Sequence, residues 1–411
     1  DFFMKTRTKL ITLLLTLLMG IEAHAAVSLC VENTTPRQRL EVVEFSAKEI
    51  WKKLGVKDGT KLVVKDMYHQ EVASQLTHDN LLLVEAAVMP DANAYFTVEA
   101  GTPQEYRSYV DGYFSHWRAD DFTWENDICA YRAYGPALQR SGEKAFGFDV
   151  WVKSTDQLDV RRRYELHKEA CKLRDELNRH GKKSEANAAF DTKSFHIDHG
   201  RGLDCYNVGP SLGCGTPAIM LGDSIVMPWC YKEYRVIDNG PLRLTFDLTY
   251  PTVSIAGSEV TEHRTITLDK GAHFNKMTVW YDGLKDNVDV AGGFVVHDEK
   301  PESLIIGRDF IAYSDPTDDA RKHNFEIYVA VVFPDGADKT AFIPDPYHRK
   351  QGITGNAVGV RRSVKSGEKV SYWFGASWCK SGTPDQQSWL NQIKTFVGNN
   401  KSPLLTKVVA E

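Results

Sequence analysis

The chain has 411 residues, of which 42% are hydrophobic and 26% are charged. This composition is typical of a folded globular protein and excludes an intrinsically disordered one. The formal net charge of −5 excludes binding to nucleic acid or to an anionic membrane through overall charge alone. Seven cysteines are too few for a disulfide scaffold in a chain of this length, and their spacing leaves any pairing open.

Residues 1–25 predict an N-terminal extension with a secretory signal peptide. Three basic residues precede an apolar run over 10–19, and the sequence AHA at 23–25 has the small-x-small pattern of a cleavage site. The apolar run is too short to span a bilayer. We therefore expect a secreted or periplasmic protein that has no membrane attachment once this segment has been removed.

Residues 26–115 predict an N-terminal β-rich lobe. Short runs such as RLEVVEF, KLVVKD and NLLLVEAAV are bounded by turn residues, as strands are. Between them, SAKEIWKKL at 46–54 predicts a short helix, because Ile50, Trp51 and Leu54 fall on one helical face.

Residues 116–411 predict the main β domain, either separate from 26–115 or continuous with it. One surface helix is expected near 155–180, where a heavily charged segment ends at Gly181, and a short helical tail near 388–397. The remainder is almost all strand, with clear alternation in LRLTFDLTY at 242–250. Many strands without a βαβ pattern predict a mainly β fold, a large antiparallel β-sandwich.

The segment FHIDHGRGLDCYNVGPSLGCG at 195–215 concentrates chemically active side chains between glycine turns. His199 and Tyr206 are candidate proton-transfer groups, and Asp204 is a carboxylate that would orient either of them. The alternative is a buried, hydrogen-bonded turn with no catalytic role. Both interpretations stay open at this point.

The same segment raises the questions of metal binding and of a serine nucleophile. No recognised zinc spacing occurs, so the metal is unknown, and no cofactor is predicted. Calcium bound through Asp198, Asp204 or Asn207 stays open, since hard cations prefer oxygen ligands. Ser211 fits the letters G-x-S-x-G, but that motif requires a strand-to-helix turn, and no helix is predicted after it.

A second candidate cluster is TWENDICAYRAYG at 123–135. Read as one strand, it places Trp124, Asn126 and Arg132 on one face and Glu125, Asp127 and Tyr131 on the other. A ring, an amide and a guanidinium suit a saccharide with a carboxylate. The alternative is that Trp124 belongs to the core and Arg132 pairs with an internal acid.

His297, in FVVHDEK, ends a predicted strand beside Asp298 and is a further candidate for substrate contact. The candidate catalytic residues are thus His199, Tyr206, Asp204 and Arg132, and the candidate substrate-binding residues are Trp124, Asn126, Glu125, Asp127 and His297.

The motifs WENDICAYRAYGPAL and DHGRGLDCYNVGPSLGCG, with the later TYPTVSIAGSEVTEHRTITL and SYWFGASW, resemble an uncharacterised exported bacterial family, domain-of-unknown-function family 4861. The resemblance covers nearly the whole mature chain. It implies a galactose-mutarotase-like β-supersandwich linked to polysaccharide degradation, often of pectin-type uronides. The family carries no established catalytic residues, and the chain lacks the His/Glu arrangement of aldose mutarotases.

Together these observations predict a carbohydrate-active protein for acidic, pectin-type polysaccharide or oligosaccharide, with β-elimination as the preferred reaction. That reaction needs a cation for the uronate carboxylate, a base for the C5 proton and an acid for the leaving oxygen. The alternatives are a glycoside hydrolase, a sugar epimerase or mutarotase, and a non-catalytic glycan-binding protein. The expected partner is a carbohydrate ligand, and the oligomeric state is left open.

Overall fold

The computed structural model describes residues 26–298, 300, 302–317 and 324–409. The predicted signal peptide lies outside the described residues. The described chain is mainly β, as predicted, and forms two compact units, one built around Val43–Glu105 and the other around Tyr106–Leu404. In the part of the chain that is described, no helix is both long and apolar enough to cross a membrane.

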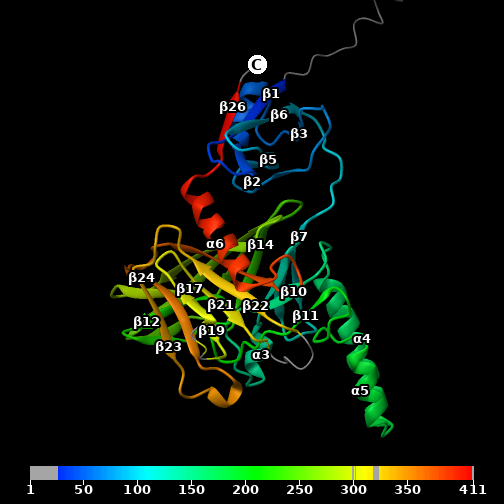
Figure 1. The fold of residues 1–411 in the computed structure, drawn as a ribbon, viewed down its shortest axis with the longest axis vertical. Helices are drawn as coiled ribbons and strands as arrows, with labels where there is room; N and C mark the ends of the chain where they lie inside the picture. Colours follow the sequence, from blue (N-terminus) through cyan, green and yellow to red (C-terminus); the bar gives the residue numbers. More distant parts are fainter. Residues whose placement is uncertain (1–25, 299, 301, 318–323, 410–411) are drawn as a thin grey trace, which may run out of the picture. The chain divides into compact units, whose positions relative to one another are not determined.

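The first unit contains two antiparallel sheets, ordered β26-β1-β6-β3 and β2-β5-β4, and helix α2 (Figure 1). Strand β26, near the end of the chain, pairs with β1, near its beginning. The predicted short helix is confirmed: the Ser46 hydroxyl accepts the Glu49 amide at its start, and Gly55 ends it with a φ of 67°. The elements are β1 (Ala26–Asn33), β2 (Arg39–Ser46), α2 (Ala47–Leu54), β3 (Leu62–Lys65), β4 (Ser74–Leu76), β5 (Leu81–Val88), β6 (Ala92–Ala100) and β26 (Leu405–Val409).

The second unit is built on three antiparallel sheets. A nine-stranded sheet, β14-β15-β17-β18-β25-β22-β21-β20 with β16 beside β17, packs on the five-stranded sheet β13-β12-β19-β24-β23. A further five-stranded sheet, β11-β10-β9-β8-β7, contributes to the same core. The strands are β7 (Val110–Ser115), β8 (Asp121–Asn126), β9 (Cys129–Ala133), β10 (Asp149–Lys153), β11 (Gly202–Asp204), β12 (Cys214–Leu221), β13 (Ser224–Val226), β14 (Glu233–Asn239), β15 (Arg243–Thr249), β16 (Val253–Ile255), β17 (Ser258–Asp269), β18 (Phe274–Asp282), β19 (Val288–Val296), β20 (Leu304–Ile306), β21 (Phe310–Asp315), β22 (Ile327–Val332), β23 (Lys339–Pro344), β24 (Gly355–Val364) and β25 (Val370–Trp378).

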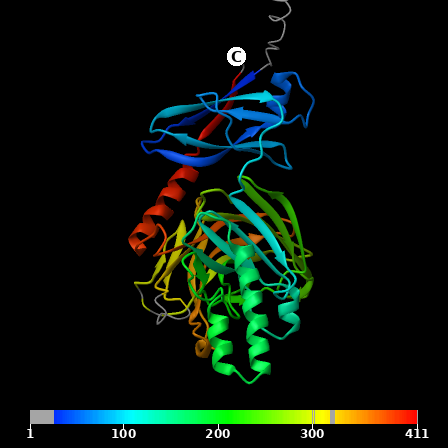
Figure 2. The same ribbon diagram turned by 90° about the vertical axis from the view of Figure 1, so that its right-hand side faces the viewer.

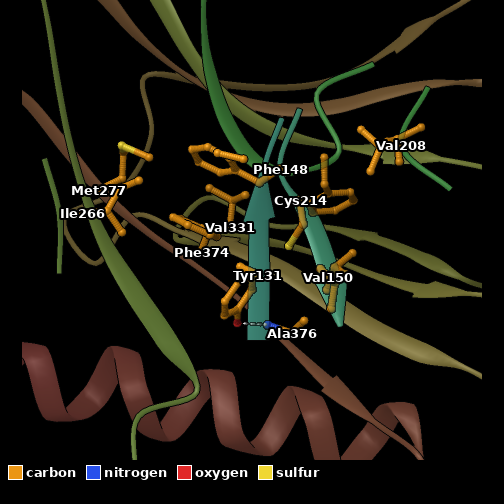
Figure 3. Packing of buried hydrophobic residues seen from close by; sticks show 14 of the residues in the cluster. Tyr131, Phe148, Val150, Val208, Cys214, Ile266, Met277, Val331, Phe374 and Ala376 are labelled. Atoms are coloured by element: carbon orange, nitrogen blue, oxygen red, sulfur yellow. Dashed lines mark hydrogen bonds between the residues drawn. The ribbon is translucent and has the colours of Figure 1, made fainter. Parts of the chain in front are cut away.

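Side chains from all three sheets fill one core. Tyr131 of β9 and Phe148 pack against Phe374 of β25, with ring centroids 5.7 and 5.6 Å apart, respectively (Figure 3). The alternation predicted for LRLTFDLTY is confirmed, because its inward positions are all fully buried: Leu242, Leu244, Phe246 and Leu248. The predicted β-sandwich is therefore held by a continuous apolar interior.

The surface helix predicted near 155–180 is confirmed, and a second helix follows it in the chain. Helix α4 (Val160–Arg179) ends before Gly181, whose φ is 75°, and α5 (Lys183–Asp191) lies beside it (Figure 2). The sequence indicated the end of the first helix at Gly181. It did not predict the short second helix, because that segment has too little amphipathic pattern. The predicted helical tail is confirmed as α6 (Gln386–Lys401), and the remaining helices are α3 (Pro136–Arg140) and the 3-10 turn η2 (Arg349–Gln351).

Candidate functional site

The segment 123–135 is a hairpin and not the single strand that was predicted. Strands β8 and β9 pair so that Trp124 lies opposite Tyr131 and Thr123 lies opposite Arg132. Trp124 and Tyr131 therefore share the core face, with stacked rings 5.5 Å apart, and Arg132 lies on the other face. The prediction that Trp124 and Arg132 share a face is wrong, because the turn at 127–128 restarts the alternation.

The hairpin side chains that were candidates for sugar contact are buried. Trp124 has no exposed surface and donates its indole N–H to Asn275 Oδ1 at 2.8 Å. Asn126 is equally buried and donates to the carbonyl oxygens of Asp269 and Ala272. Its own Oδ1 accepts the amides that close the hairpin turn. The arrangement matches the alternative in which Trp124 belongs to the core.

The carboxylates of the hairpin also have internal partners. Glu125 is 1% exposed and accepts the Lys153 ammonium at 2.6 Å and the amides of Asp159 and Val160, at the start of α4. It therefore fixes the helix N-terminus, where a negative charge is favourable. Asp127 is half-buried and accepts one backbone amide.

Arg132 joins the two predicted segments. Its guanidinium contacts Asp149, lies 3.0 Å from Asp204 Oδ2, and has Asp121 Oδ2 at 3.8 Å. We call these four residues the Arg132 cluster. Arg132 and Asp204 are each 3% exposed, so the segments 123–135 and 195–215 do meet, but in a sealed position. The geometry favours the alternative in which Arg132 pairs with internal acids.

The Arg132 cluster holds more acid than base. Burial raises the pKa of Asp149 to about 7 and the pKa of Asp121 to about 6, although the Arg132 charge opposes both shifts. One cation cannot neutralise three buried carboxylates at low dielectric, so a proton is retained in the cluster near neutral pH. This gives the protein a pH-dependent element of stability.

Replacing Asp121 with asparagine should flatten the dependence of stability on pH. Because the pKa of Asp121 is higher in the folded than in the unfolded chain, its contribution is fully present below pH about 4 and is lost as pH rises through about 6. Urea unfolding of the wild type should therefore give a free energy that falls over this window, and Asp121→Asn should fall less steeply. Asp223→Asn, at an exposed carboxylate whose pKa is held low by the hydrogen bond from Lys339, should not flatten the slope. Equal slopes for Asp121→Asn and the wild type would contradict the prediction.

The HGRG part of the second segment is a turn, as predicted. Asp198 Oδ1 accepts the amides of Gly200 and Gly202. Gly202 has a φ of 104°, and a Cβ there would lie 2.0 Å from the Val152 carbonyl oxygen, so the close approach of β11 to β10 requires glycine. His199 is exposed, and its Nε2 lies 3.2 Å from the Ser194 carbonyl oxygen. The turn leaves His199 at the surface, away from the Arg132 cluster's carboxylates.

The calcium ligands suggested by the sequence have separate partners. Asp198 binds turn amides, Asp204 contacts Arg132, and Asn207 donates to the Gln351 carbonyl oxygen. Within the described ranges, no group of three or more His, Cys, Asp or Glu side chains has a metal-binding arrangement. All seven cysteines lie in these ranges, and none of them forms a disulfide there.

Tyr206 is buried beside a histidine. Its hydroxyl donates to the Gly213 carbonyl oxygen at 3.0 Å, and burial raises its pKa well above the ordinary value. The phenol is therefore neutral and already committed to a backbone acceptor. Its ring stands edge-on to the His297 ring, with centroids 5.9 Å apart.

His297 forms the group with the clearest potential for proton transfer. It follows β19, and its Nδ1 lies 2.5 Å from Oδ2 of Asp315, the fully buried last residue of β21. The amides of His297 and Asp298 both donate to the Tyr313 hydroxyl, which fixes the backbone. Among the described residues, the buried His297 Nε2 has no hydrogen-bond partner. We call His297, Asp315, Tyr206 and Tyr313 the His297 site.

The electrostatics of the His297 site favour a protonatable imidazole. Burial lowers the pKa of His297, but the adjacent Asp315 carboxylate, the Asn207 backbone and the Asp298 charge together outweigh it, and the net shift is upward. The His297 side chain is 9% exposed, but its Nε2 is buried, so the nitrogen that would take up a proton is shielded from solvent in this structure. A histidine with one nitrogen held by a carboxylate is suited to general acid–base chemistry, and His297 can act in this way once a substrate reaches its buried Nε2.

A cation lies at the same edge of the nine-stranded sheet. Asp315 is in register with Ile327, which is in register with Trp378, the last residue of β25. Two residues later, the Lys380 ammonium lies 5.0 Å from the Trp378 ring and 5.2 Å from the exposed Phe325 ring. We call Lys380, Trp378 and Phe325 the Lys380 rim. The edge therefore combines a proton-transfer group, a cation and aromatic surface.

Sequence reasoning identified His297 but missed its partners. His297 was found because it ends a strand next to an acidic residue, whereas Asp315 and Lys380 belong to strand ends far along the chain. A weak signal existed in FIAYSD, where an apolar strand ends on a carboxylate. Nothing in the spacing connects that carboxylate with His297.

The fold and the site define a large antiparallel β-sandwich protein with a His–Asp pair at one sheet edge. The family described as domain of unknown function (DUF4861) matches residues 31–405, and the chain belongs to this family. The resemblance drawn from the sequence motifs is thereby confirmed.

One curated relative and two solved structures that are similar to the chain share low sequence identity with it. The chain is 26% identical over 337 residues to "Uncharacterized protein P7" of Formosa agariphila, covering 79% of this chain and 77% of that protein. It is similar, at 10% identity and a TM-score of 0.45, to an alpha-mannosidase from Enterococcus faecalis V583. A protein of glycosyl hydrolase family 38 from the same species gives 9% identity and a TM-score of 0.46. The matches to the two solved structures each cover 94% of this chain. This chain spans 46% of the first structure's chain and 47% of the second's.

Proposed function

We propose that this protein is an exported carbohydrate-active enzyme that acts on acidic, uronic-acid-type polysaccharide or oligosaccharide through proton transfer at His297. The observation that carries the proposal is the His297–Asp315 pair. Asp315 holds Nδ1 at 2.5 Å, and Nε2 has no hydrogen-bond partner among the described residues. The substrate class is the one that the motif resemblance implies, and export is proposed because residues 1–25 predict a signal peptide.

The reaction that fits this arrangement is β-elimination at a uronic acid. His297 Nε2 takes the C5 proton, the C5–H electron pair forms the C4–C5 double bond, and the C4–O bond breaks. The imidazolium formed by removal of the C5 proton then donates that proton to the leaving oxygen. Asp315 stabilises that imidazolium and fixes the tautomer of the free base.

The substrate carboxylate requires a cation, and the proposal assigns this role to Lys380. Arg132 is committed to the buried carboxylates of its cluster. Lys380 is 34% exposed in its side chain, lies at the sheet edge where Asp315 ends, and has a long ion pair with Asp198 Oδ2, at 3.8 Å. Trp378 and Phe325 give that cation apolar surroundings, which strengthens its attraction for a carboxylate. Hydrolysis is less well supported, because Glu125 and Asp204 already have internal cationic partners.

The proposal is tested by incubating the purified chain with polygalacturonate, with rhamnogalacturonan and with a neutral glucan. We expect ultraviolet absorbance from an unsaturated product with an acidic substrate and none with the neutral glucan. New reducing ends without this absorbance would identify a hydrolase and overturn β-elimination. Retention on immobilised acidic polysaccharide without any product would identify a glycan-binding protein and overturn catalysis.

A further inference from the structure

A pocket of about 110 Å³ lies between the two sheets of the sandwich, away from the His297 site. We call it the Trp229 pocket. Its volume is several times what one buried water needs, about 10–15 Å³ in the same measure. The residues that line it come from β12, β13, β16, β17, β18 and the loops between them, and most of them are apolar; the polar exceptions are Ser254, Glu262 and the hydroxyls of Tyr250 and Tyr281.

One lining residue of the Trp229 pocket, Glu262, belongs to an ion pair with Arg264, at strand positions where alternation predicts apolar residues. Along β17, Val260, Ile266 and Leu268 face the core and are at most 1% exposed. Glu262 and Arg264 occupy the intervening inward positions. The Arg264 Nε donates to Glu262 Oε1 at 2.5 Å, and Arg264 has no exposed surface. Burying two charges carries a desolvation penalty of several kcal/mol per ion, and an apolar pair is often as stable. Stability alone therefore does not account for this pair.

Two buried polar atoms at this pair have no partner. Within the residues that the structure describes, neither the Tyr281 hydroxyl nor Arg264 Nη1 makes a hydrogen bond. Tyr281 lines the pocket, is 1% exposed, and lies directly opposite Glu262 across β17 and β18. An unsatisfied buried hydroxyl costs about 1–3 kcal/mol, which a ligand hydroxyl would recover. The pocket thus offers an unused donor beside a carboxylate acceptor.

Aromatic surface completes the Trp229 pocket. Trp229 is 47% exposed, and the buried Tyr250 ring lies 4.0 Å from the Arg264 guanidinium carbon. Flat rings beside paired hydroxyl donors and acceptors match the apolar and polar parts of a sugar ring. Glu262 and Arg264 together carry no net charge, but only Glu262 lines the pocket, so a uronate would meet a carboxylate and would be repelled.

We infer that the Trp229 pocket binds a single neutral sugar ring, with Glu262 and Tyr281 on its hydroxyls and Trp229 against its apolar face. This site is separate from the His297 site. Ile219 in the pocket pairs with Val290, near the start of β19, whereas His297 follows the end of that strand, about 20 Å farther along. The inference therefore does not rest on the proposed reaction.

The test is calorimetric titration of the full chain with a panel of neutral monosaccharides and with galacturonate. One neutral sugar should bind with a stoichiometry of one, and galacturonate should bind at least tenfold more weakly. Tyr281→Phe, which removes only the unpartnered hydroxyl, should weaken binding by about 3- to 10-fold, and Trp229→Ala, at an exposed position, should weaken it at least as much.

Two control variants show whether a loss of affinity is specific to the Trp229 pocket. Tyr328→Phe removes a tyrosine hydroxyl that donates to Glu326 outside the pocket and should leave the affinity unchanged. His297→Gln should also leave it unchanged, so failure of the proposed reaction and failure of this inference are distinguishable. Three results would overturn the inference: no neutral sugar binds, galacturonate binds as well as the neutral sugar, or Tyr281→Phe and Trp229→Ala both keep full affinity.

Discussion

Replacing Arg132 with methionine should lower the free energy of unfolding at pH 8 by about 3–5 kcal/mol. The substitution keeps most of the apolar volume but leaves Asp149 and Asp204 buried without their cation. The loss should be smaller near pH 5, because the buried carboxylates can then take up protons. Urea unfolding followed by far-ultraviolet circular dichroism at both pH values measures the effect.

Arg235 provides the matched control for Arg132. It forms an ion pair with Asp247 at 2.7 Å, but its side chain is 74% exposed, so Arg235→Met should change the free energy of unfolding by about 1 kcal/mol or less. Adding Asp149→Asn to Arg132→Met should recover part of the lost stability by removing one uncompensated charge. If Arg132→Met were as stable as the wild type and lost only carbohydrate binding, Arg132 would contact the ligand, as the sequence pattern suggested.

Replacing His297 with glutamine should reduce kcat on the acidic substrate by at least about 100-fold, the usual contribution of a general acid or base. Glutamine keeps a polar side chain of similar length but cannot carry the proton. Initial rates followed by ultraviolet absorbance give the effect, and a thermal melt shows whether the variant is folded. A folded His297→Gln variant with full activity would remove His297 from the reaction.

The pH dependence of the rate distinguishes catalysis by His297 from a packing role. Because Asp315 holds the pKa of His297 above its ordinary value, the neutral base forms only at higher pH, and kcat/KM should rise through that raised pKa. Asp315→Asn should move the rise to lower pH while slowing the reaction. His263→Gln is the matched control: His263 Nε2 also faces a carboxylate, Asp282 Oδ2 at 3.2 Å, and its loss should leave both rate and profile unchanged.

Local patterns predicted most of the scaffold. The alternation at 242–248, the amphipathic helix over 46–54 and the helical tail were visible because each depends on neighbours a few residues away. The second surface helix was missed because nine residues with little amphipathic character give almost no periodic signal. The glycines of 195–215 indicated sharp turns, and the contact of Gly202 with the Val152 carbonyl supplies the reason.

The candidate site was less predictable because its geometry depends on which faces are buried. In 123–135 the sequence placed Trp124 and Arg132 together, but a two-residue turn reversed the chain and separated them. The inward charges Glu262 and Arg264 interrupt the apolar positions of β17, but strand alternation does not indicate whether a face contacts solvent, a second sheet or a pocket.

The sequence by itself determined the family, the mainly β class and the turn positions, because these follow from composition, motifs and contacts between near neighbours. Only the tertiary structure determined which polar side chains are fully paired in the interior and which have a polar atom without a hydrogen-bond partner. Arg132 contacts three carboxylates because they lie on other strands of its own sheet, and His297 contacts Asp315 because the ends of β19 and β21 lie together. Burial then set the pKa of each group, and no local pattern encodes burial produced by a second sheet.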